Sequence, residues 1–260
     1  MKRNTIIFLT ITLLALSIIS GCGSNNGADA PPTGVPINTR GPSTTSGNEQ
    51  PDSDTQSSGK GDANISEPTT VPEPSAVPIQ PEEIPEYITI RNERYSTALT
   101  ELNFMGMNLE NEEIEPLKYM VNLTYLHLAG NKISNLSSIS GLTKLVDLQL
   151  ANNQISDISL LSGLNNLTVL SLGNNQISDL SPLSGLTNLT ALGLENNRIS
   201  DLSPLSGLTK LAQLGLRSNR INDLSPLSGL ADLWFLNVDS DNISDWSPVA
   251  HVSMLNGIWQ

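Results

Sequence analysis

The sequence predicts a repeat solenoid of the α/β class, in which short strands stack into one parallel β-sheet. The main observation is a 22-residue period in the leucines from residue 123 onward: Leu123, Leu145, Leu167, Leu189, Leu211 and Leu233. The residues between these leucines also recur in step, so every copy carries the same apolar pattern. A fixed period of about 20 to 50 residues is typical of solenoids, whose repeats stack because no single repeat can bury its own apolar face.

Within one copy, two groups of apolar residues line opposite walls of a coil. Leu167, Leu170 and Leu172 begin a short strand, and Ile177, Leu180, Leu183 and Leu186 return the chain along the other wall. We therefore expect all seven side chains to point into the coil, with strands of neighbouring coils pairing in parallel about 4.8 Å apart.

An asparagine follows each strand at the place where the chain must turn. The column comprises Asn131, Asn153, Asn175, Asn197 and Asn219. A buried amide offers two donors and an acceptor, which can satisfy backbone groups in its own coil and in the next one. We interpret the column as a structural ladder rather than as a ligand site.

The return segment Ser-Asp-Leu-Ser-Pro-Leu-Ser-Gly-Leu, at 178–186 and again at 200–208, resembles that of the leucine-rich repeats of bacterial internalins. The resemblance extends from about Leu99 to the C-terminus. It implies a right-handed leucine-rich repeat superhelix, with the parallel β-sheet on the concave face and short 3₁₀ turns on the convex face. It also implies a protein that binds other proteins at a cell surface.

Residues 1–22 are predicted to be a targeting segment. Lys2 and Arg3 precede an apolar run that is too short for a comfortable membrane span, which takes about 20 residues. The run ends in Ile19-Ser20-Gly21-Cys22, and Cys22 is the single cysteine of the chain. This end resembles the lipobox of bacterial lipoproteins, which implies lipidation of Cys22; an ordinary cleaved signal peptide and a buried apolar helix are the alternatives.

Residues 23–85 are rich in Pro, Gly, Ser and Thr and contain few large apolar residues. Such a segment cannot bury enough surface to offset its ordering entropy. We expect a disordered tether that holds the solenoid away from the membrane.

The two ends of the solenoid depart from the repeat. We expect residues 86–122 to form an N-terminal cap and an atypical first repeat, with a small hairpin, a 24-residue coil and a short helix over 108–120. Six 22-residue repeats then fill 123–254, and 255–260 is a truncated end. In the last copy Asp241 replaces the ladder asparagine, and we expect Trp246 and Trp259 to cover the open end of the core.

Composition excludes several classes of function. The net charge of −13 leaves no basic stripe for a nucleic-acid backbone. One cysteine cannot form an internal disulfide, no Cys/His spacing suggests a metal site, and no phosphate loop is present. The only histidines, His127 and His251, lie far apart in the repeat register, so we expect neither an enzyme nor a cofactor.

The aspartates that precede each return segment also recur once per coil: Asp157, Asp179, Asp201, Asp223 and Asp245. An Asp before a Leu-Ser-Pro turn is a natural cap for exposed N–H groups. A calcium ladder is the less favoured alternative, because the glycine-rich Asp repeat of calcium-binding β-helices is missing.

Strand residues that point away from the core line the concave face and are free to vary. The middle of this face is small, with Gly173, Ala191, Gly193 and Gly215, and larger groups gather at the two ends. Our candidate contacts for a protein partner are Tyr125, His127, Asp147, Gln149, Glu195, Gln213, Arg217, Trp234 and Phe235, since aromatic and Arg side chains are frequent interface anchors.

The sequence thus predicts a surface-displayed recognition protein, lipid-anchored at the outside of a bacterial cell membrane, that binds an unidentified protein by its concave face. A carbohydrate- or peptidoglycan-binding module and a purely structural envelope protein remain alternatives.

Overall fold

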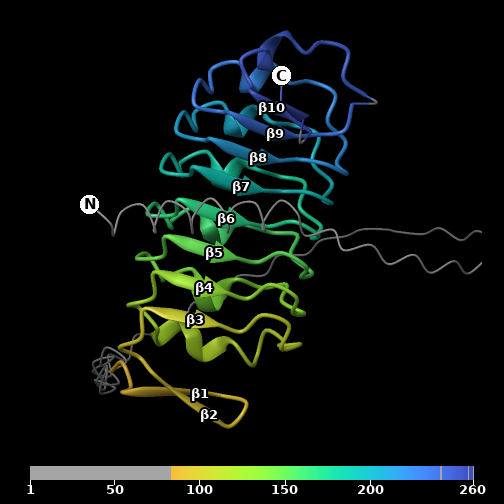
Figure 1. The fold of residues 1–260 in the computed structure, drawn as a ribbon. Coiled ribbons are helices and arrows are strands. Elements are labelled where there is room, and N and C mark those ends of the chain that lie inside the picture. Colours follow the sequence, from red (N-terminus) through yellow and green to blue (C-terminus); the bar gives the residue numbers. More distant parts are fainter. Residues whose placement is uncertain (1–82, 241, 257, 260) are drawn as a thin grey trace, which may run out of the picture. The chain divides into compact units, whose positions relative to one another are not determined.

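The computed structural model describes residues 83–240, 242–256 and 258–259. In this part of the chain, a hairpin of β1 (Tyr87–Ile90) and β2 (Glu93–Ser96) precedes a nine-stranded sheet whose strands stack in sequence order (Figure 1). The sheet consists of β3 (Glu101–Asn103), β4 (Tyr125–His127), β5 (Asp147–Gln149), β6 (Val169–Ser171), β7 (Ala191–Gly193), β8 (Gln213–Gly215), β9 (Phe235–Asn237), β10 (Met254–Leu255) and β11 (Ile258–Trp259). Strands β3 to β10 are parallel, and β11 returns antiparallel to β10.

The strand register confirms the 22-residue period. From β4 to β9, each strand pairs with the residue 22 positions further on, as in Leu170 with Leu192. The first coil has the expected 24 residues, because Leu102 of β3 pairs with Leu126 of β4. The last coil is shorter than a regular repeat, since Leu236 of β9 pairs with Leu255 rather than with residue 258.

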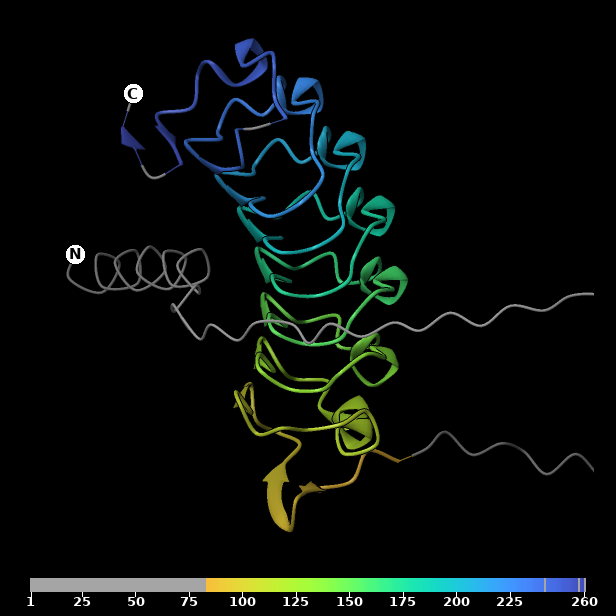
Figure 2. The ribbon, with the colours of Figure 1, turned by 90° about the vertical axis from the view of Figure 1, so that its right-hand side faces the viewer.

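Short 3₁₀ helices lie opposite the sheet, on the convex side of the coils (Figure 2). They are η1 (Glu115–Tyr119), η2 (Ser137–Ile139), η3 (Ser159–Leu161), η4 (Ser181–Leu183), η5 (Ser203–Leu205), η6 (Ser225–Leu227) and η7 (Ser247–Val249). The capping role expected of the aspartate column is confirmed. Asp179 Oδ1 accepts the backbone N–H of Ser181 at 2.8 Å, and Asp157, Asp201, Asp223 and Asp245 accept the equivalent bonds.

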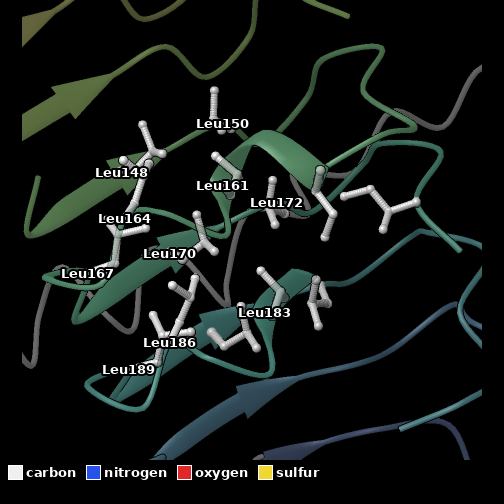
Figure 3. Packing of buried hydrophobic residues seen from close by; sticks show 14 of the residues in the cluster. Leu148, Leu150, Leu161, Leu164, Leu167, Leu170, Leu172, Leu183, Leu186 and Leu189 are labelled. Carbon is white, nitrogen blue, oxygen red and sulfur yellow. The ribbon is translucent and has the colours of Figure 1, made fainter. Parts of the chain in front are cut away.

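The leucine columns form one continuous core. All seven apolar side chains of the 167–186 coil are at most 1% exposed, as predicted. Figure 3 shows how leucines of neighbouring coils pack against one another, such as Leu148, Leu170 and Leu172. Since each fully buried leucine contributes about 1.5–3 kcal/mol, the stability of each coil depends on its neighbours.

The N-terminal cap closes the first end of this core. The β1–β2 hairpin turns at Arg91 and Asn92, which both adopt positive φ as a tight two-residue hairpin turn requires. Its Ile88 and Ile90 are at most 3% exposed. The helix expected over 108–120 is shorter: only η1 is helical, and it is a 3₁₀ helix. Pro116 explains this, because it lacks an N–H and disfavours the α conformation in the residue before it.

At the other end, Trp246 is partly buried and packs against the core, to which Val249 and Val252 also belong. Trp259 pairs with Met254 through its backbone, while its side chain and Asp241 lie outside the described residues. The predicted targeting segment with Cys22 and the tether up to residue 82 also lie outside them. No helix in the described part of the chain has the length and hydropathy to cross a membrane.

Candidate functional site

The ladder asparagines use their side-chain amides within the scaffold. Asn175 Nδ2 donates to Leu150 O at 3.1 Å and to Leu172 O at 3.0 Å, while its Oδ1 accepts the N–H of Ile155 at 2.9 Å. Each amide therefore connects its own coil to the preceding one. Equivalent bonds are made by Asn131, Asn153, Asn197 and Asn219.

A second asparagine column was not singled out from the sequence. Asn152, Asn174 and Asn196 immediately precede ladder asparagines and have φ of 57°, 55° and 53°. Asn tolerates this left-handed conformation better than most residues. The repeated Asn-Asn pairs in the sequence indicate both roles: the first asparagine adopts the left-handed conformation of the turn, and the second connects the coils.

The N-terminal end of the concave face carries a polar cluster formed by Tyr125, His127, Asp147 and Gln149, all of them predicted contacts. Tyr125 Oη lies 3.4 Å from His127 Nδ1, and Gln149 Nε2 donates to Asp147 Oδ1 at 2.6 Å. Burial raises the pKa of Asp147, opposed by the bond from Gln149, and lowers the pKa of His127. His127 is therefore neutral at pH 7, so the cluster presents mainly hydrogen-bonding groups.

The middle of the concave face is low and flat. Its outward residues on β6 and β7 are Val169, Ser171, Ala191 and Gly193, and all four are buried among their neighbours. No charged side chain stands on these two strands. A partner can therefore approach the sheet backbone closely here.

The C-terminal half of the face carries five predicted contacts, and three of them, Glu195, Gln213 and Arg217, lie on the two coils before that of Asn237. Gln213 and Gly215 are the outward residues of β8, and Asn237 of β9 pairs with Gly215. The Glu195 carboxyl group extends over Gly215: a Cβ atom added to that glycine would overlap Glu195 Oε1. Asn237 was absent from the predicted contacts although it lies in one of the outward columns.

Arg217 lies close to Asp239 of the following coil. Its Nε lies 3.4 Å from Asp239 Oδ1, and its side chain is 61% exposed. Asp239 also accepts the N–H of Ser218 at 2.5 Å. Arg217 is thus the most accessible of the predicted contacts in this half of the face.

The aromatic pair Trp234 and Phe235 packs edge-to-face, with ring centroids 5.9 Å apart. Phe235 is 7% exposed, whereas Trp234 is half-buried. Phe235 therefore offers little free surface, and Trp234 offers the larger accessible area.

The described residues contain no group of three or more His, Cys, Asp or Glu side chains arranged to hold a metal ion. His251 Nε2 lies 2.9 Å from Leu230 O, on a different coil from His127. The predicted contact residues of the concave face offer hydrogen-bonding groups, charge and aromatic surface.

Comparison with known proteins agrees with this architecture. A family model described as leucine rich repeats (2 copies) matches residues 121–165, 143–185, 165–207 and 187–229. The crystal structure of internalin C2 from Listeria monocytogenes is similar, with 34% identity and a TM-score of 0.52, covering 64% of this chain and 84% of that one.

An internalin, InlF, from the same organism has 31% identity and a TM-score of 0.52, and the match covers 63% of this chain but only 56% of that one. A leucine-rich repeat protein from Leptospira interrogans has 24% identity and a TM-score of 0.49, over 54% of this chain and 44% of that one. Among curated protein sequences, no significant match was found.

Proposed function

This chain belongs to the leucine-rich repeat proteins and has an internalin-like solenoid, and on that basis we propose that it binds another protein through its concave face. One observation carries the proposal. The leucines that recur at the pattern positions of the repeat are buried in the core, so the outward strand residues have no packing role in the coil interior and form a continuous sheet surface. Polar and aromatic groups stand at both ends of this surface and a flat middle lies between them, a layout that suits an extended protein contact rather than a small ligand.

We further propose that the protein is displayed at the outside of a bacterial cell membrane, anchored through a lipid on Cys22. The support is the lipobox-like end of the targeting segment and the polar, proline-rich stretch that follows it. One acyl chain binds a membrane only weakly, so stable anchoring requires more than one chain. Cys22→Ala should move the protein from the membrane fraction to the soluble fraction; unchanged membrane association would disprove the anchor.

The binding face is tested by capture from envelopes of the organism that produces the protein, with the full chain as bait. The test variant combines Tyr125→Ala and Arg217→Ala, which truncate accessible groups at opposite ends of the face. Arg220→Ala is the matched control, because Arg220 is an exposed arginine of the same coil that lies beyond the ladder asparagine Asn219.

We expect one protein to be enriched by the natural chain and by the control but not by the double variant. Enrichment that survives the double variant would exclude the concave face. Retention on purified peptidoglycan or another glycan, with no protein enriched, would instead support a carbohydrate-binding module.

A further inference from the structure

We propose that the concave face contains a receptor site for a guanidinium group, formed by Glu195, Gln213 and Asn237 around Gly215. The inference rests on the proposed protein-binding function and deepens it, since it assigns an arginine side chain to the partner. Its basis is that three residues around this glycine each carry a buried acceptor oxygen without a hydrogen-bond donor.

The three side chains stand on positions that surround one glycine. Gln213 lies two residues before Gly215 on β8, so both face the concave side. Asn237 is the register partner of Gly215 on β9. Glu195 reaches the same place from the coil of β7, where its Oε1 occupies the position of the missing Cβ of Gly215. The absence of a side chain at residue 215 is what lets the carboxyl group lie against the sheet.

Each of these side chains carries a buried oxygen without a hydrogen-bond partner. In the described part of the chain, the buried side-chain atoms in this condition are Glu195 Oε1, Gln213 Oε1 and Asn237 Oδ1. Gln213 as a whole is only 8% exposed. Buried polar atoms are rarely left unpaired, because the loss of hydration is not compensated. Three such atoms on neighbouring positions of the sheet indicate that a donor is missing there.

The nearest charges do not supply this donor. The strand β6 on one side of β7 carries no titratable residue. On the other side, the coil of β8 brings Arg217, whose guanidinium faces Asp239 of the following coil. Burial raises the pKa of Glu195 to about 7, opposed only by its own backbone N–H, and no cation lowers it. The ionised carboxylate is therefore poorly stabilised until a positive group arrives.

A guanidinium group fits this site better than a metal ion does. It has five N–H donors and no acceptor, so it can serve three separate oxygens, and its flat, weakly hydrated face suits a surface without side chains. Calcium takes about 6–8 oxygen ligands, usually with several carboxylates, whereas the site has one carboxylate. Because Glu195 Oε1 faces the sheet, binding requires its side chain to rotate toward the ligand.

The test is an NMR titration of the full chain with N-acetyl-arginine amide, followed at the backbone amides of Gly215 and Asn237. The matched probes are N-acetyl-citrulline amide, which has the same shape without the charge, and N-acetyl-lysine amide. Glu195→Gln removes the carboxylate, and Glu101→Gln is the control, since Glu101 is an exposed carboxylate on β3 of the same sheet.

We expect saturable shifts with a dissociation constant on the order of millimolar for the arginine probe, at least about tenfold weaker binding in Glu195→Gln, and unchanged binding in Glu101→Gln. Binding should weaken as the pH falls below about 7, because protonation of Glu195 removes the negative charge. Equal binding of the citrulline probe would overturn the role of charge. Equal binding of the lysine probe, or the same shifts with calcium alone, would overturn the guanidinium assignment.

Failure of this proposal is distinguishable from failure of the proposed function. If the arginine probe causes no shift while the double variant of Tyr125 and Arg217 still abolishes capture, the receptor site is wrong and the binding face stands. A normal pKa for Glu195 together with no probe binding would show that the two amides already satisfy the carboxylate, which also overturns the site.

Discussion

Replacing Asn175 by alanine should destabilise the solenoid much more than replacing an exposed asparagine. The truncation removes one bond within the coil, to Leu172 O, and two bonds to the preceding coil, with Leu150 O and the N–H of Ile155. The backbone N–H of Ile155 then loses its acceptor. The two carbonyl oxygens each keep another donor, because Leu150 O still accepts a bond from Asn153 Nδ2 and Leu172 O still accepts one from Asn197 Nδ2, both at 3.0 Å.

The magnitude follows from these contacts. A buried donor left unpaired costs about 1–3 kcal/mol, and each of the two other lost bonds about 0.5–1.5 kcal/mol, so the free energy of unfolding should fall by about 2–6 kcal/mol. Asn175→Asp is a sharper variant, because it keeps the acceptor for Ile155 but directs an oxygen at two carbonyl oxygens. We expect it to destabilise the protein at least as much at pH 7.

The assay is urea unfolding of the full chain, followed by circular dichroism, with Asn165→Ala as control. Asn165 is exposed, and it is its backbone oxygen, not its side chain, that accepts the bond from Asn188 at 2.9 Å. The control should change stability by less than about 0.5 kcal/mol. If Asn175→Ala were no worse than the control, or if Asn175→Asp behaved like the natural protein, the ladder would not be holding the coils together.

Three further predictions concern ionisable groups and one glycine. Asp179→Ala should lower the melting temperature at pH 7, and the difference should disappear as the pH falls through the pKa of Asp179, which the bonds from Ser181 hold below its usual value; equal melting curves at pH 7 would contradict the cap. Burial raises the pKa of Glu195 to about 7, so the free energy of unfolding of the natural chain should fall as the pH rises from 4.5 to 7, by at most about 3 kcal/mol. Glu195→Gln should not show this fall. Unfolding at pH 5 and pH 8 measures the difference, and parallel pH dependence of the two proteins would refute it. Gly215→Ala should displace the Glu195 carboxyl group toward water with little loss of stability, which NMR titration would detect as a Glu195 pKa close to the ordinary value; an unchanged pKa would mean that the carboxyl does not lie over this glycine.

Much of the fold could be predicted because the same pattern of apolar residues recurs in every repeat. One leucine in isolation is ambiguous, but Leu170 recurs as Leu192 and Leu214, and only stacked coils hide them all. The expected helix over 108–120 was the main error in the fold. The spacing of its apolar residues suits an α-helix, but that spacing takes no account of Pro116, and only the 3₁₀ helix η1 forms.

The candidate site was less predictable, because the sequence determines which residues point outward but not where their long side chains go. Phe235 was expected to be an accessible anchor, yet it is covered by its neighbours. Asn237 was passed over, although it stands beside the group formed by Glu195 and Gln213. These arrangements depend on contacts between different coils, which a single repeat does not encode.

The sequence by itself determined the period, the buried leucines and the two walls of each coil, because burial depends on a pattern that is repeated along the chain. Only the tertiary structure decided that Glu195 lies across Gly215 and that neighbouring positions carry three oxygens without donors. That arrangement involves side chains from three successive coils, and no spacing along one coil specifies it.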